Sequence, residues 1–224
     1  GMIHPNMATT LAFVTTDAAV DRATLSKLLH DATEQTFNRA SVDGDTSTND
    51  SIYVMASGGA SSRAIEAKSA AGRRFSSALT EVLESLAKKI VADGEGAEHL
   101  VRIEVHGART DADAVQIART VAGSQLVTTA LHGCDPNWGR ILAAAGRSGV
   151  RFNPDHVSMK IGSVPIFEAG TPVMTAKTEA KAAATMKRPE YVISMSVGRG
   201  RGLGHYWTCD LGHEYVRINA DYRT

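Results

Sequence analysis

The sequence predicts an α+β fold built as a single domain. Short apolar runs rich in β-branched residues are mixed with longer stretches of helical periodicity. The C-terminal third is rich in predicted strands and contains a predicted β-hairpin, and no repeat, linker or low-complexity tract divides the 224 residues. A hydrophobic content of 43% is ample for a packed core. We therefore expect helices that cover stacked mixed sheets.

Strands and helices alternate through the first half of the chain. Asp17 and Asp21 are candidate helix caps, and apolar residues follow at helical spacing to about Arg39. A second helix should end near Asp93, where Gly94 can adopt the left-handed conformation of a helix cap. The apolar face of this second helix comprises Phe75, Ala78, Leu79, Val82, Leu83, Leu86 and Ile90. The predicted strands are 11–15, 52–56 and 100–106.

The second half begins with a helix whose first residue is Asp111 or Asp113. Residues 124–131 fit either a helix or a strand, and periodicity does not separate the two. A short alanine-rich helix is predicted at 141–145, and a hairpin turns at Gly162. The other predicted elements are the hairpin strands 157–161 and 164–167, the helix 175–187 before Pro189, and the strands 191–197, 204–210 and 215–220.

The bulk composition excludes several classes of function. The formal net charge is zero, with 24 basic and 24 acidic residues, so we expect no nucleic-acid and no membrane partner. No apolar run approaches membrane-spanning length, and no signal segment opens the chain. Cys134 and Cys209 form no CxxC pair, which is typical of buried, reduced thiols. The expected location is the cytoplasm.

The opening stretch, from Gly1 to Asp17, carries the most specific pattern. A turn-prone Pro-Asn pair leads to Ala8, then to the hydroxyls of Thr9 and Thr10, then to an apolar strand. A threonine at the mouth of a strand can act as a nucleophile when its own freed α-amine takes its proton. That amine exists on Thr9 only after the Ala8–Thr9 bond is cut. Without further information, the same residues would simply start a strand.

The residues Gly-Met-Ile-His-Pro-Asn-Met-Ala-Thr, followed by the strand and Thr-Thr-Asp-Ala, resemble the self-cleavage site of the ornithine acetyltransferases, or glutamate N-acetyltransferases. The resemblance extends over the whole chain. It implies cleavage between Ala8 and Thr9, with Thr9 as the nucleophile. Residues 1–8 would then end the α-chain, and residues 9–224 would form the β-chain as one α+β domain. Thr10 stands where this family more often has Met or another apolar residue.

The resemblance also implies a four-layer αββα sandwich of the self-processing, N-terminal-nucleophile-like type. It assigns binding of the amino-acid substrate to Thr9, Glu95, Asn219 and Thr224. Spacing alone would make Glu95, between two glycines, a solvated residue after a helix, although such a carboxylate can bind an ammonium group. It would make the last residues a frayed tail. Asn and Thr nevertheless offer both donors and acceptors to an amino acid.

The implied reaction is ping-pong acetyl transfer from N2-acetylornithine to glutamate, through an acetyl-threonine intermediate, in arginine biosynthesis. No metal or cofactor is expected, and some family members accept acetyl-CoA as a substrate. The implied partner is the α-chain of the same precursor, which supplies the oxyanion hole and a substrate-binding Lys, and the αβ units are expected to dimerise. Two alternatives are an N-terminal-nucleophile aminopeptidase or amidase, and a catalytically silent fragment that acts as a binding module.

The sequence assigns no catalytic or binding role to two polar segments. Residues 43–50 are dense in oxygen ligands, but Val54 occupies the twelfth position, where a calcium loop has Glu, so capped turns are favoured. Residues 135–140 could place an indole and a guanidinium near a ligand, and the same residues also fit a structural turn with Trp138 packed.

Overall fold

The computed structural model describes residues 2–4, 10–47, 49–60 and 63–221. Ala8, Thr9 and Thr224, to which the sequence analysis assigns roles, lie outside the described residues. The chain forms two compact units. We call Met2–Ala40 with Gly44–Lys89 the N-terminal unit, and Ser41–Asp43 with the residues from Ile90 onward the C-terminal unit. The expectation that residues 9–224 form one domain stays a prediction.

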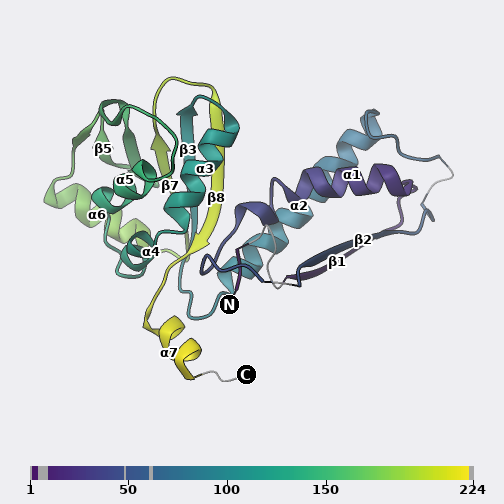
Figure 1. Ribbon diagram of the computed structural model, residues 1–224, viewed down its shortest axis with the longest axis horizontal. Helices are drawn as coiled ribbons and strands as arrows, with labels where there is room; N and C mark the ends of the chain where they lie inside the picture. Colours follow the sequence, from purple (N-terminus) through teal and green to yellow (C-terminus); the bar gives the residue numbers. More distant parts are fainter. Residues whose placement is uncertain (1, 5–9, 48, 61–62, 222–224) are drawn as a thin grey trace. The chain divides into compact units, whose positions relative to one another are not determined.

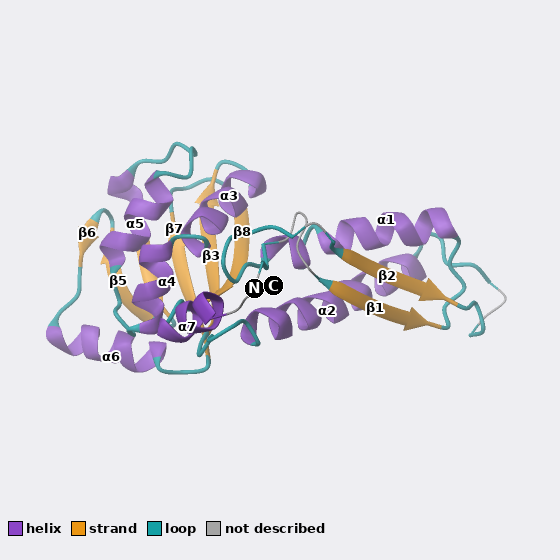
Figure 2. Ribbon diagram, turned by 60° about the horizontal axis from the view of Figure 1, so that its bottom comes forward, coloured by secondary structure: helices purple, strands orange, loops and turns teal. Residues whose placement is uncertain are grey.

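The N-terminal unit is built on two parallel strands. β1 (Leu11–Thr16) and β2 (Ser51–Ala56) pair in register from Leu11 opposite Ser51 to Thr16 opposite Ala56. α1 (Arg22–Thr33) and α2 (Ala70–Ala92) lie on the same side of these strands in Figure 1, and Figure 2 shows the two strands side by side. The side chains of β1 alternate accordingly, with Ala12 buried and its neighbours Leu11 and Phe13 exposed.

The first helix is shorter than predicted. Asp21 caps it as expected, because its carboxylate accepts hydrogen bonds from the backbone N–H groups of Ala23 and Thr24 at 2.9 and 3.0 Å. The helix ends at Thr33, however, and a 3₁₀ helix, η1 (Phe37–Arg39), follows. The extension to Arg39 is therefore wrong. Thr36 leaves the helical region, with φ −123° and ψ −87°, which breaks the run before the periodicity stops.

The second helix, α2, is confirmed, but it buries only part of the predicted apolar face. Residues at every fourth position are the most deeply buried, namely Leu79, Leu83, Ala87 and Val91. Val82, which the sequence places on the apolar face, is 45% exposed. The stripe that α2 buries is therefore narrower than the apolar residues of the sequence suggest.

The C-terminal unit contains a six-stranded mixed sheet of order β6-β5-β4-β7-β3-β8. β3 and β7 are parallel, and the other neighbours are antiparallel. The strands are β3 (Leu100–Ala108), β4 (Ser158–Ile161), β5 (Val164–Glu168), β6 (Thr171–Pro172), β7 (Glu190–Ser196) and β8 (Gly202–Cys209). The helices are α3 (Asp111–Ala122), α4 (Gln125–His132), α5 (Trp138–Gly146), α6 (Ala176–Met186) and α7 (His213–Asp221), and a 3₁₀ helix, η2, spans Pro154–His156.

One face of this sheet forms the core of the unit. Along β3 the side chains of Val101, Ile103 and Val105 are fully or almost fully buried, and they belong to one cluster with residues of α3, α4, α5 and α6. The intervening residues Arg102 and Glu104 are half-buried, and they form an ion pair at 3.2 Å. The unit is thus a sheet with helices packed on its apolar face. The predicted mixture of strands and helices is confirmed.

Three predicted elements of the second half can be compared with the structure. The hairpin of β4 and β5 is confirmed, and Gly162 takes a positive φ of 56° in its turn. Residues 124–131, for which helix and strand were both open, form most of the helix α4. The predicted strand at 215–220 is wrong, because these residues lie in the helix α7. With no strand beside them among the described residues, their backbone groups are satisfied by helical hydrogen bonds instead.

The difference between Leu83 and Val82 can be tested directly. We expect Leu83→Ala to lower the free energy of unfolding by about 2–5 kcal/mol, because it removes apolar contacts and leaves a cavity. The matched control, Val82→Ala, should change it by no more than about 0.5 kcal/mol, since that side chain is already largely in solvent. Urea unfolding followed by circular dichroism measures both. Equal losses for the two variants would contradict the observed face of α2.

Candidate active site

Glu95 lies in a tight turn between α2 and β3. The backbone N–H of Ala97 donates to the carbonyl of Gly94 at 2.9 Å, which closes the turn. Gly96 adopts the left-handed conformation, with φ 71°, whereas Gly94 does not, so the prediction that placed this conformation at Gly94 is wrong. A Cβ on Gly96 would lie 2.7 Å from the backbone nitrogen of Tyr215. The turn therefore requires glycine both for its dihedral angles and for its close approach to α7.

Asn219, on α7, meets Glu95 directly. Its side-chain Nδ2 donates to Glu95 Oε2 at 2.8 Å, across 124 positions of sequence. The same nitrogen donates to the carbonyl of Tyr215 at 3.0 Å, which holds the amide against its own helix. Glu95 is half-buried and Asn219 is exposed. Of the four predicted substrate-binding residues, the two that the structure describes thus lie in contact.

The hydrogen bond also stabilises the ionised form of Glu95. The amide of Asn219 lowers the pKa of this carboxyl below its ordinary value, because the bond stabilises the ionised form. Glu95 therefore remains a carboxylate well below neutral pH. An ionised carboxylate beside a side-chain amide can bind the ammonium group of an amino acid.

At the start of β1, Thr10 is closed off from solvent. It is only 5% exposed, and its hydroxyl oxygen is buried with no hydrogen-bond partner among the described residues. Its backbone N–H donates to the carboxylate of Asp50, which precedes β2. The Thr10 hydroxyl thus lies out of contact with solvent.

Asp50 is a residue that the sequence analysis did not assign. Burial raises the pKa of its carboxyl, and the hydrogen bond from the Thr10 N–H acts in the opposite direction. The sequence signal that could have pointed to Asp50 is its place at the end of the oxygen-rich segment 43–50, just before the predicted strand 52–56. Because β1 and β2 are parallel, residues just before each strand lie at the same end of the sheet. Asp50 is therefore set beside the start of β1.

Both unassigned polar segments also contribute hydrogen bonds or ring contacts to the C-terminal unit. Asp43 accepts a hydrogen bond from the hydroxyl of Tyr215 at 3.2 Å. Asn137 caps α5 by accepting from the backbone N–H of Arg140 at 3.1 Å, and Trp138 stacks on Phe167 with ring centroids 5.0 Å apart. Within the described part of the chain, no group of His, Cys, Asp and Glu side chains is arranged to hold a metal ion.

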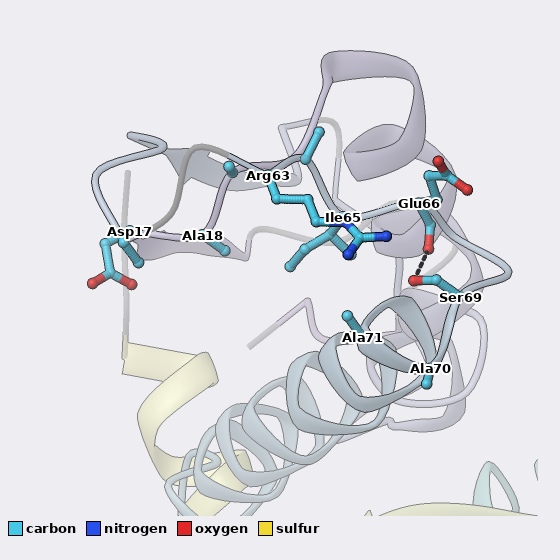
Figure 3. Close-up of a pocket in the computed structure, with 11 residues that line it drawn as sticks. Asp17, Ala18, Arg63, Ile65, Glu66, Ser69, Ala70 and Ala71 are labelled. Atoms are coloured by element: carbon cyan, nitrogen blue, oxygen red, sulfur yellow. Dashed lines mark hydrogen bonds between the residues drawn. The ribbon is translucent and has the colours of Figure 1, made fainter.

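A cavity of 530 Å³ opens within the N-terminal unit, beside the first turn of α2 (Figure 3). Its lining is mostly alanine, with the polar side chains of Asp17, Arg63, Glu66 and Ser69. Figure 3 shows the Ser69 hydroxyl bonded to the Glu66 carbonyl, at 2.7 Å, so this serine supports the loop before the helix. None of the described site residues lines this cavity, and we assign it no part in the site.

Comparison with known proteins identifies the family. The ArgJ family model matches residues 1–224, the entire chain. The chain belongs to the ArgJ family. It is 46% identical over 231 residues to the arginine biosynthesis bifunctional protein ArgJ of Synechocystis, and 50% identical over 224 residues to the protein of the same name in Desulfotalea psychrophila. The whole chain takes part in both alignments.

The chain spans little more than half the length of these ArgJ relatives, 56% and 57% respectively. The crystal structure of ArgJ from Bacillus halodurans matches with a TM-score of 0.92 at 43% identity, over 96% of this chain and all of that one. This likeness confirms the predicted fold class. No helix in the described ranges combines the length and apolar character needed to cross a membrane.

The contact between Asn219 and Glu95 can be tested through the pKa of Glu95. In Asn219→Ala the pKa of Glu95 should rise toward its ordinary value, because the hydrogen bond that stabilises the carboxylate is lost. A pH titration of the side-chain carboxyl carbons by NMR measures the shift.

Arg217→Ala, on the same helix, is the matched control. Arg217 is bonded to Glu214 and lowers the pKa of that carboxyl. This variant should raise the pKa of Glu214 and leave that of Glu95 unchanged. An unchanged Glu95 pKa in Asn219→Ala would show that the observed hydrogen bond is absent in solution.

Proposed function

We propose that this chain is the β-chain of an ornithine acetyltransferase, a cytoplasmic enzyme that moves an acetyl group from N2-acetylornithine to glutamate. Membership of the ArgJ family supports the proposal, as do relatives named for arginine biosynthesis. The observation that carries it is the 2.8 Å hydrogen bond between Asn219 and Glu95. It joins two residues, far apart in sequence, that the resemblance assigns to the same amino-acid substrate.

The proposed activity begins with self-cleavage between Ala8 and Thr9. The hydroxyl oxygen of Thr9 attacks the carbonyl carbon of Ala8, the amide bond breaks, and an ester forms. Water then hydrolyses the ester, which leaves a carboxylate on Ala8 and a free amine beside a free hydroxyl on Thr9. The buried hydroxyl of Thr10 supports Thr9 as the nucleophile. The match with the B. halodurans ArgJ crystal structure covers the whole of that chain and 96% of this one. This agreement in extent supports a β-chain that exists as a separate polypeptide.

Acetyl transfer then uses the new N-terminus. The α-amine, with an ordinary pKa of roughly 7.7–8.0, takes the proton of the Thr9 hydroxyl as its oxygen attacks the acetyl carbonyl of N2-acetylornithine. The C–N bond breaks, the proton passes to the leaving nitrogen, and ornithine departs from an acetyl ester on Thr9. The unprotonated amine of glutamate attacks this ester, and its proton returns to the Thr9 oxygen. Acetyl-CoA would donate by the same attack, with its thiol as the leaving group.

The amino-acid part of each substrate is proposed to be held by Glu95, Asn219 and Thr224. The lowered pKa of Glu95 supports this role, because an ionised carboxylate attracts an ammonium group at neutral pH. The amide of Asn219 holds that carboxylate through a single oxygen, Oε2. Binding of both substrates at one place fits a ping-pong reaction, in which the first product leaves before the second substrate enters.

We further propose that the missing partner, the α-chain of the precursor, binds the open face of β1 and β2. Four large apolar side chains lie exposed on it: Leu11 at 65%, Phe13 at 59%, Tyr53 at 50% and Met55 at 51%. Phe13 and Tyr53 are opposite each other in the register and stack at 5.4 Å between ring centroids. We call these four residues the β1–β2 face. Parallel sheets in proteins are normally covered on both faces, and two strands alone are marginal.

The length of the ArgJ relatives supports the α-chain as the partner that covers the β1–β2 face. More than two fifths of each of these ArgJ relatives has no counterpart in this chain, since only 56% and 57% of their lengths are covered. A segment of that length can supply further strands beside β1 and β2 and an apolar surface over the β1–β2 face. The resemblance assigns the oxyanion hole to the same α-chain, so the proposal joins assembly to activity. The assembled αβ units are expected to dimerise.

The β1–β2 face can be tested by charge substitution. We expect Phe13→Asp to weaken association with a co-expressed α-chain by at least about tenfold, because it buries a charge in an apolar contact. Leu126→Asp is the matched control, since Leu126 is 63% exposed on α4 and lies outside the β1–β2 face. Co-purification with a tagged α-chain and titration calorimetry measure the effect. Equal binding by both variants would contradict this surface.

The nucleophile is tested by two matched substitutions in the full precursor. Thr9→Val should abolish both self-cleavage and acetyl transfer, because valine keeps the shape but lacks the hydroxyl. Thr10→Val should retain both, since its hydroxyl is buried without a partner among the described residues. Intact-mass analysis reports cleavage, and radiolabelled acetyl groups report transfer. Acetyl transfer that survives Thr9→Val would overturn the mechanism.

The same assay separates the other two functions. An aminopeptidase or amidase would release free acetate in the presence of glutamate, because water would accept the acyl group. A silent binding module would bind amino acids without turnover, even with the α-chain present. Formation of N-acetylglutamate without net release of acetate supports the proposed enzyme. A protein that still carries Ala8 on Thr9 has no free amine, and it should be inactive.

A further inference from the structure

A buried carboxylate, Asp210, lies between the two segments that carry Glu95 and Asn219. It directly follows β8, and its side chain has no exposed surface. One oxygen, Oδ1, accepts hydrogen bonds from the backbone N–H groups of Glu98 and His99, at 2.8 and 2.7 Å. These residues follow the turn that holds Glu95. Asp210 therefore fixes the point at which that turn joins the sheet.

The other oxygen of Asp210 fastens the chain that leads to Asn219. Oδ2 lies 2.8 Å from Nδ1 of His132, at the end of α4. The next residue, Leu211, donates its backbone N–H to the carbonyl of Thr128, also on α4, at 3.1 Å. Gly212 packs so closely that a Cβ there would lie 2.4 Å from the His132 ring. The helix α7 then starts at His213, so its entry is held at several points.

The two segments fastened by Asp210 also meet each other. A Cβ on Gly96 would lie 2.7 Å from the nitrogen of Tyr215 and 2.8 Å from Cβ of Glu214, in the first turn of α7. A shift of the turn or of the helix entry would therefore alter the distance between Glu95 and Asn219. The carboxylate of Asp210 is the group that touches the attachments of both segments.

We propose that Asp210 is a positioning residue for amino-acid binding in the acetyl-transfer reaction. Through Glu98, His99 and His132 it holds Glu95 and Asn219 at hydrogen-bond distance, without contacting substrate. Three donors satisfy its two oxygens, which allows a carboxylate to be retained in a fully buried position. Removing the side chain would leave these donors unpaired and let the turn and the helix shift apart. This inference rests on the proposed function.

The test uses the full precursor and compares kcat with KM. We expect Asp210→Ala to raise KM for both N2-acetylornithine and glutamate by about 10- to 100-fold, with kcat within about threefold, because substrate binding is lost rather than the nucleophile. Asp210→Asn should rescue KM to within about fivefold of the native value, since the amide oxygen can still accept from both N–H groups and the amide nitrogen can donate to His132 in the tautomer whose Nδ1 is an acceptor.

A double-mutant cycle tests whether Asp210 acts through the Glu95–Asn219 pair. In an Asn219→Ala background, Asp210→Ala should raise KM far less than in the native background, because the contact it maintains is already gone. Asp111→Ala is the matched control. Asp111 also accepts from a backbone N–H, that of Leu203 at 2.8 Å, but it touches neither segment, so KM should not change.

A second variant covers the case in which Asp210→Ala does not fold. His132→Ala removes the Oδ2 partner and the ring on which Gly212 packs, but it leaves both Oδ1 hydrogen bonds in place. The ring is 27% exposed, so this variant should raise KM in the same direction by a smaller factor. Unchanged KM values in Asp210→Ala or, failing that, in His132→Ala would overturn the inference, as would additive effects in the cycle. Acetyl transfer that survives Thr9→Val would instead refute the proposed function, so the two failures are distinguishable.

Discussion

The antiparallel pairing of β3 with β8 is the constraint on which the described part of the site depends. Leu100, at the start of β3, lies opposite Cys209, at the end of β8. Antiparallel neighbours bring the residues before one strand beside those after the other. The turn of Glu95 comes before β3, and α7 with Asn219 comes after β8. The sheet thus brings together two segments that are more than a hundred positions apart.

Hydrogen bonds and close packing then fix the positions of the two segments that the sheet pairing brings together. Asp210 ties the start of β3 to the chain after β8, and Gly96 lets the turn approach α7 without a side chain between them. The final contact, between Asn219 and Glu95, lowers the pKa of the carboxyl that is proposed to meet the substrate. A polar site of this kind needs a rigid frame, since a small displacement removes a hydrogen bond.

The N-terminal unit follows a different logic. Asp50, just before β2, accepts a hydrogen bond from the backbone N–H of Thr10, just before β1, and so fixes the start of β1. The two strands nevertheless leave the β1–β2 face exposed. Such a surface is costly in water and typical of an interaction site. The relatives, nearly twice as long, contain the sequence that could cover it. Assembly and activity would then depend on the same strands, because the segment proposed to hold the nucleophile leads directly into β1.

The sequence predicted most helices and strands because their periodicity is local. It failed where the outcome depended on distant parts of the chain. Residues 215–220 alternate like a strand, but no described strand lies beside them, and they form a helix. The left-handed glycine is Gly96 rather than Gly94, because the turn packs against α7. Val82 fits an apolar stripe, but the neighbours of α2 leave it exposed.

The sequence by itself determined the α+β class and the family, because local periodicity predicts the first and the motif residues along the chain match the second. It also contains the Ala8–Thr9 motif, at which self-cleavage is proposed. Only the tertiary structure decided that Asn219 bonds to Glu95, that Asp210 accepts hydrogen bonds from the backbone of Glu98 and His99, and that the Thr10 hydroxyl is buried. A hydrogen bond between positions 124 residues apart leaves no periodic trace in the sequence. It exists because the pairing of β3 with β8 brings its donor and its acceptor together.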